Sequence, residues 1–236
     1  GMFAVAISTV ILPSLSKRHV DADPLRFSQT MDWGVRMVLF LGLPAMAGIM
    51  VLREPILRAL FMRGHFGVHE VSMAGASLLA SSCGILSLML ARVLAPGFHA
   101  RQDTKTPVRY GVHSMISNMV FNAILIYPMG YIGLALSTAL SGTVNAISLF
   151  QGLYRRGIYT PGRATLVFSV RLLLATLAMA AVLEWLKAPL EQWIAWSQWY
   201  SVWELTKLLV IGLVTYIITM FAVGIRVHHF KTVTES

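Results

Sequence analysis

Long apolar blocks run through the 236-residue sequence, and they constrain its fold more than any other feature. The chain is 56% hydrophobic and only 12% charged, whereas a soluble domain carries about 25% charged residues. A helix needs about 20 apolar residues to cross a bilayer, because each residue rises about 1.5 Å. The blocks reach that length and lack the alternation of barrel strands. We therefore predict an all-α, polytopic membrane helix bundle.

One partial span and six complete spans are expected from these blocks. The partial span covers 1–13, and the complete spans cover 33–52, 71–94, 108–127, 131–153, 165–186 and 205–225. Only Pro128, Met129 and Gly130 separate two of the spans. These two helices must therefore form a tight antiparallel hairpin.

The first apolar run is shorter than the others and ends at Pro13. Thirteen helical residues reach only about 20 Å, whereas the hydrocarbon core is about 30 Å thick. We therefore expect the chain to begin inside a transmembrane helix. The N-terminal half of the same protein is then an expected partner.

The Lys and Arg residues predict an orientation, because short cytoplasmic loops are enriched in them. One set of connections carries eleven basic residues and the other carries four. The richer set holds Lys17, Arg18, Arg26, Arg101, Lys105, Arg109, Arg155, Arg156, Arg163, Arg226 and Lys231, and the poorer set holds Arg53, Arg58, Arg63 and Lys187. We predict a multi-pass protein of the bacterial inner membrane, with the richer set and the C-terminus in the cytoplasm.

The sequence argues against catalysis and against nucleic-acid binding. It contains no HExxH, G-x-S-x-G or Walker A pattern, and no metal-ligand spacing surrounds its single cysteine, Cys83. The net charge of +9 comes from residues between apolar blocks, not from basic patches interleaved with aromatic residues. We expect a protein that is not an enzyme, holds no metal and does not bind nucleic acid.

Small and polar side chains form stripes along both helices of the predicted hairpin. Ser114, Asn118 and Asn122 recur at every fourth position, which places them on one helix face. The facing helix repeats the pattern with Gly133, Ser137, Ser141 and Asn145. Helix packing explains such stripes, since small residues allow close approach and amides bond across helices. The alternative is a cation site or the wetted wall of a cavity.

Two arginines fall near the ends of spans. Arg36 lies one turn inside the span 33–52, with Asp32 four residues before it as a partner, and Arg92 lies near the end of 71–94. Both could extend their side chains to the membrane interface. The alternative is that they face a cavity and contact an anionic substrate headgroup, because guanidinium groups suit phosphate oxygens.

Three segments resemble the MurJ/MviN family. The most specific is residues 93–107, VLAPGFHARQDTKTP, where a span ends in Leu-Ala-Pro-Gly-Phe and a charged loop follows. Residues 1–16, GMFAVAISTVILPSLS, and residues 31–36, MDWGVR, are also similar to that family. The resemblance extends over essentially the whole chain.

The resemblance implies a MATE-like transporter of the MOP superfamily. Residues 1–153 would be its C-terminal lobe, and residues 154–236 would supply two additional helices that form a lipid-tail groove, with a cytoplasmic tail. Family members flip lipid II, the undecaprenyl-pyrophosphate-linked peptidoglycan precursor, to the periplasmic leaflet by alternating access. Lipid II and membrane lipids are therefore the implied partners.

Some relatives bind Na⁺, which is the only cofactor that the resemblance raises. Asn118, Asn122, Leu134 (through its carbonyl) and Thr138 fall at the matching places, although Asn122 stands where a carboxylate would be. Two alternatives to the flippase remain open. One is another MOP-superfamily exporter, of drugs or of polysaccharide-linked lipids, and the other is a non-transporting membrane scaffold.

Overall fold

The protein is described here from a computed structural model, which covers residues 2–20, 24–61 and 68–225. All its elements in these ranges are helical: α1 (Met2–Val20), α2 (Pro24–Phe61), α3 (Val68–Ser82), α4 (Ile85–His99), α5 (Lys105–Arg155), α6 (Arg163–Leu186), α7 (Leu190–Ala195) and α8 (Gln198–Ala222). Five segments are long and apolar enough to cross a membrane. The predicted all-α membrane bundle is therefore confirmed. Arg63, Arg226 and Lys231 of the orientation prediction lie outside the described residues.

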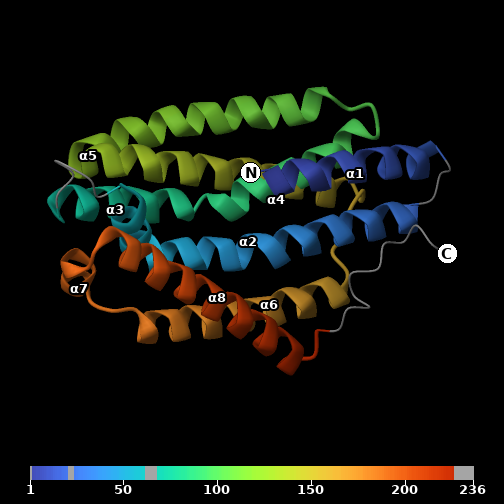
Figure 1. The fold of residues 1–236 in the computed structure, drawn as a ribbon. Helices are drawn as coiled ribbons and strands as arrows, with labels where there is room; N and C mark the ends of the chain where they lie inside the picture. Colours follow the sequence, from blue (N-terminus) through green and yellow to red (C-terminus); the bar gives the residue numbers. More distant parts are fainter. Residues whose placement is uncertain (1, 21–23, 62–67, 226–236) are drawn as a thin grey trace.

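The long helix α5 folds back on itself. Gly130 has φ 55° and ψ −130°, values that interrupt the helix and favour glycine. Figure 1 shows the two halves lying antiparallel, side by side. A side chain on Gly133 would meet the backbone oxygen of Leu125, so the halves approach as closely as backbones can. The predicted hairpin around Pro128–Gly130 is confirmed.

The predicted span 71–94 is interrupted in the structure. A turn at Cys83 and Gly84 separates α3 from α4. A Cβ on Gly84 would lie 2.7 Å from the Cα of Ala139, so the turn brings this backbone directly against α5. Together α3 and α4 still form a single candidate span from Val71 to His99.

Two of the predicted spans continue further than expected. The first helix passes through Pro13 to Val20, and α2 covers 38 residues instead of 33–52. At about 1.5 Å per residue α2 is roughly 57 Å long, well beyond a hydrocarbon core of about 30 Å. Its ends therefore project on both sides of a membrane of that thickness.

The interior contains two hydrophobic cores, and α2 contributes to both. The first joins the first half of α2 to α1, α4 and the second half of α5, around Met31, Phe98 and Leu153. The second joins the remainder of α2 to α6, α7 and α8, around Leu172 and Trp193. Helices α6 and α8 therefore pack on the bundle mainly through α2.

The connections gather at two opposite ends of the bundle (Figure 1). The C-terminal ends of α1, α4, α5 and α8 lie at one end, here called the basic end because it carries the larger set of Lys and Arg residues. The hairpin tip, the end of α2 and the short helix α7 lie at the other, here called the aromatic end. Trp185, Trp199 and Trp203 are exposed there, 84%, 85% and 61% respectively.

Asp103 fixes the start of α5 at the basic end. Its carboxylate accepts hydrogen bonds from the amide and the hydroxyl of Thr106, at 3.0 and 2.6 Å, and pairs with Arg156 at 2.6 Å. The Thr106 hydroxyl and amide, together with the Arg156 guanidinium, lower the pKa of Asp103 to about 2. The interaction therefore joins the first turn of the hairpin to the residue that follows its last turn.

We expect Asp103→Asn to lower the free energy of unfolding by about 1 kcal/mol at pH 7, because it removes the charge that pairs with Arg156 while keeping an acceptor for the Thr106 amide. Because the folded-state pKa is below the usual value of about 3.9, this stabilisation is complete above pH 4 and is lost as the pH falls toward 2. Melting temperatures of both proteins at several pH values measure it. If the difference in melting temperature between the unsubstituted protein and the variant does not narrow below pH 4, the stabilising role of the Asp103 carboxylate is contradicted.

Candidate functional site

An apolar groove lies between α2, α6 and α8, with a volume of about 370 Å³. This is within the range of about 300–1,000 Å³ that is usual for ligand pockets. Its walls carry almost only hydrophobic side chains. The lining residues are Phe40, Leu41, Pro44, Ala45, Gly48, Leu52, Met179, Leu183, Leu209, Gly212, Leu213, Tyr216 and Ile217. Such a surface suits a hydrocarbon chain and offers little to a polar ligand.

The groove follows α2 from Phe40 to Leu52, a rise of roughly 18 Å along the helix axis. Gly48 leaves open space, since a Cβ there would meet nothing within 4 Å. Tyr216 has the one polar side chain among the lining residues. Its hydroxyl donates a hydrogen bond to the Phe40 carbonyl at 2.9 Å and therefore needs no partner from a ligand. The groove is therefore an elongated apolar surface.

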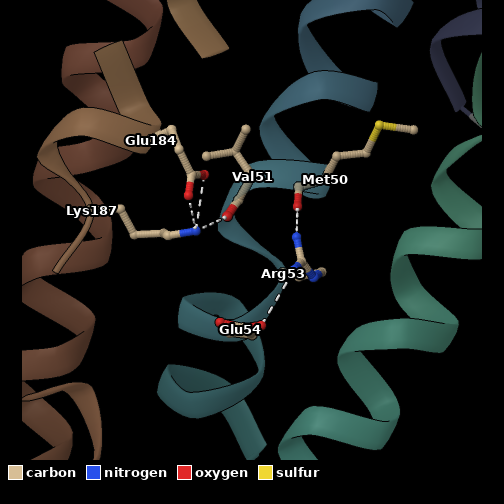
Figure 2. Close-up of polar contacts among 6 residues, drawn as sticks. All are labelled: Met50, Val51, Arg53, Glu54, Glu184 and Lys187. Carbon is tan, nitrogen blue, oxygen red and sulfur yellow. Dashed lines mark hydrogen bonds and ion pairs between the residues drawn. The ribbon is translucent and has the colours of Figure 1, made fainter. Parts of the chain in front are cut away.

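Polar contacts tie α2 to the connector between α6 and α8 at the aromatic end. Lys187 forms an ion pair with Glu184 at 2.9 Å and donates to the Val51 carbonyl at 3.4 Å (Figure 2). Gln198 donates to the Ala59 carbonyl at 2.6 Å. The bonds to the Val51 and Ala59 carbonyls cross between elements, and they hold the connector and the start of α8 against α2.

Arg58 makes the most buried of these contacts and is only 7% exposed. Its guanidinium donates to the carbonyls of Trp193, Ile194 and Trp196, at 3.0, 3.3 and 2.8 Å. The accepting carbonyls lie at the end of α7, where a helix leaves carbonyl groups without partners. We call three sets of contacts the α2 clamp. They are those of Arg58 with the carbonyls at the end of α7, of Lys187 with Val51, and of Gln198 with Ala59.

Arg36, a candidate for headgroup contact, lies between α2 and α6. Its Nε and Nη2 atoms donate to the Thr165 hydroxyl at 3.0 and 2.8 Å, and its guanidinium lies 5.8 Å from the ring centre of Phe168. Asp32, its predicted partner, accepts a hydrogen bond from the Tyr159 hydroxyl at 2.8 Å. Burial, and then the neighbouring Asp32 carboxylate, raise the pKa of Tyr159 above its usual range. Arg36 therefore attaches the first turn of α6 to α2 through hydrogen bonds.

Arg92, the second headgroup candidate, lies on another helix. It is exposed on α4, between the buried residues Ala91 and Val93. The groove lining includes neither Arg92 nor Arg36. The structure thus places the two candidate arginines outside the apolar groove and on different elements.

The polar stripes of the hairpin face each other, as predicted. The Ser114 hydroxyl donates to the Ser141 carbonyl at 2.7 Å, and the Asn118 amide donates to the Ser141 hydroxyl at 3.3 Å. Asn122 donates to the Asn118 side-chain oxygen at 3.1 Å. The Oδ1 atoms of Asn122 and Asn145 are buried and have no hydrogen-bond partner. These contacts join the two halves of α5.

Leu134 and Thr138, the other two cation candidates, lie on the exposed side of the second half of α5. The Thr138 hydroxyl donates to the Leu134 carbonyl at 3.1 Å, and the Thr138 carbonyl accepts from Ser141 at 3.0 Å. Hydrogen bonds therefore connect the four candidates through Ser141. Within the described residues no cluster of His, Cys, Asp and Glu could hold a metal ion.

Comparison with known proteins identifies what this architecture resembles. The family model described as lipid II flippase MurJ matches residues 1–203. The probable lipid II flippase MurJ of Vibrio cholerae is 47% identical over 235 residues, which cover 100% of this chain and 45% of the relative. The protein of the same name from Haemophilus influenzae is 44% identical over 238 residues, which cover 98% of this chain and 46% of the relative. This chain thus spans about half the length of these curated relatives.

A solved structure has the same fold. The structure titled "Lipid II flippase MurJ, inward closed conformation" superposes with a TM-score of 0.75 over 93% of this chain and 42% of that chain. The two sequences are 23% identical, so this likeness bears on the fold alone.

Proposed function

Since this chain belongs to the lipid II flippase MurJ family, we propose that it forms part of a transporter that moves lipid II from the cytoplasmic to the periplasmic leaflet by alternating access. The observation that carries this proposal is the apolar groove between α2, α6 and α8, which suits a polyprenyl tail. The chemistry is translocation without bond making or breaking, so the protein acts as a transporter and not as an enzyme.

The proposed protein lies in the bacterial inner membrane with its basic end in the cytoplasm. The excess of Lys and Arg residues at that end supports this orientation. The lipid tail would lie in the groove formed by residues 154–236 together with α2. The pyrophosphate headgroup would contact arginines, with Arg92 and the Nη1 group of Arg36 as candidates in this chain.

We assign the polar hairpin to helix packing instead of Na⁺ binding. Asn122 donates to Asn118, and Asn118 donates across the hairpin to Ser141, which is the kind of interhelical bond that holds membrane helices together. Leu134 and Thr138 satisfy each other on the exposed side. A carboxylate ligand would have to come from outside this set.

Gly48→Phe tests the groove, because its ring would occupy open space on the groove wall without meeting the backbone. Displacing about two methylene groups of a bound tail removes roughly 1.5 kcal/mol of hydrophobic contact, so we expect about a tenfold loss of transport. The measurement is lipid II translocation by the full-length protein, with its melting temperature determined in parallel.

Gly111→Phe is the matched control. Gly111 also faces open space, but it lies on α5 and outside the groove lining. We expect transport by this variant to remain near that of the unsubstituted protein. Equal transport by both variants would favour a scaffold role or a different path for the tail.

A further inference from the structure

A second pocket lies beside the first two turns of α6, at the basic end, and shares no lining residue with the apolar groove. Its volume is about 280 Å³. Arg163 and Arg171 line it together with Ala164, Val167 and Phe168. The two arginines are eight residues apart, which places them on one face of the helix, with an apolar surface between them.

The positive charge of this pocket is not neutralised within the described part of the chain. No carboxylate there forms an ion pair with Arg163 or Arg171. Arg171 instead donates its Nη1 group to the Gly224 carbonyl, at 3.1 Å, just beyond the end of α8. The guanidinium of Arg36 lies 5.8 Å from the ring centre of Phe168, but the Asp32 carboxylate beside Gly162 offsets its charge, so the excess comes from Arg163 and Arg171. The pocket therefore favours an anion.

The surroundings of the pocket indicate a lipid and not a soluble anion. Leu166, Val167 and Val170 on the same two turns are 57%, 51% and 57% exposed, as expected of a helix surface that faces hydrocarbon. Arg171 extends from within the apolar part of α6 toward the basic end, the usual behaviour of a long cationic side chain at a membrane interface. Guanidinium groups beside exposed apolar side chains suit a phosphate that is joined to glycerol and acyl chains.

We propose that this pocket binds the phosphate group of an anionic glycerophospholipid from the leaflet at the basic end. Through Arg171 and Gly224, the bound lipid would connect the beginning of α6 with the end of α8. The site shares no lining residue with the tail groove.

The test is native mass spectrometry of the full-length detergent-solubilised protein, titrated with phosphatidylglycerol. In Arg163→Gln with Arg171→Gln we expect the affinity of the tightest-bound phosphatidylglycerol to fall about fivefold for each arginine removed. The matched control is Arg101→Gln with Arg155→Gln, which removes two exposed arginines of the same end and should leave that affinity unchanged. The single variant Arg163→Gln, which retains the Arg171 contact with α8, provides the same test should the double variant fail to fold.

Four results would overturn the proposal. The first three are an equal loss in the two double variants, no loss in either, and displacement of phosphatidylglycerol by millimolar inorganic phosphate, which would indicate a soluble anion. Retention of zwitterionic phosphatidylcholine as tightly as phosphatidylglycerol would also contradict a site for an anionic lipid.

Discussion

Replacing Arg58 with alanine should destabilise the protein by about 3–4 kcal/mol, because hydrogen bonds from a charged donor contribute about 1.5–3 kcal/mol each. The substitution leaves the buried carbonyl of Trp193 and the partly buried carbonyls of Ile194 and Trp196 without this donor. It also leaves a cavity where a nearly buried side chain had packed. We expect the melting temperature of the full-length protein to fall by about 3 °C.

Arg53→Ala is the control for this prediction. Arg53 lies five residues earlier on α2 and has 29% of its side chain exposed. It donates to the Met50 carbonyl at 2.8 Å and to Glu54 at 3.4 Å, both on its own helix (Figure 2). Such a pair near the surface contributes about 1 kcal/mol or less. If the two variants melt within about a degree of each other, the α2 clamp has no special role in stability.

Replacing Gly133 with valine should prevent the hairpin of α5 from closing. A Cβ at this position would lie 2.3 Å from the Leu125 carbonyl oxygen and 2.7 Å from its carbonyl carbon. Both atoms belong to the backbone, so no side-chain rotation relieves the overlap and the two halves must separate. Separation would also break the contacts of Ser114 and Asn118 with Ser141. We expect a loss of more than about 3 kcal/mol, seen as little monodisperse protein after extraction.

Gly111→Val measures the effect of the same substitution without the close contact. Gly111 lies on the first half of α5, and a Cβ there meets nothing within 4 Å. The change should alter the free energy of unfolding by no more than about 0.5 kcal/mol, as is usual where an added side chain meets no neighbour. Comparable yields of the two valine variants would show that the hairpin tolerates the added side chain and that the close approach is not required.

Features set by local sequence were predictable. The apolar run that predicted a helix over 165–186 became α6, and Pro128–Gly130 predicted the hairpin turn. The predicted start of the last helix was late, because Ser197 caps α8 by accepting a hydrogen bond from the Tyr200 amide at 3.4 Å. A serine before a helix is a recognised start signal, so this boundary was within reach of the sequence.

Features set by distant contacts were not predictable. From the sequence, Arg58 was assigned to a loop outside the cytoplasm. In the folded chain it donates hydrogen bonds to carbonyls more than 130 residues away. The sequence predicted that Arg36 pairs with Asp32 on its own helix, whereas in the structure its guanidinium donates hydrogen bonds to the Thr165 hydroxyl on α6. The groove was expected from the last two long helices, but α2 supplies one of its walls. Each case depends on which helices become neighbours, which periodicity does not specify.

The most direct test of the proposed function is the transbilayer distribution of lipid II in cells depleted of the full-length protein. The proposal predicts that lipid II accumulates on the cytoplasmic face, and that the unsubstituted protein restores its outward movement while Gly48→Phe does so poorly. Normal amounts of lipid II on the periplasmic face after depletion, in cells without a substitute flippase, would contradict it.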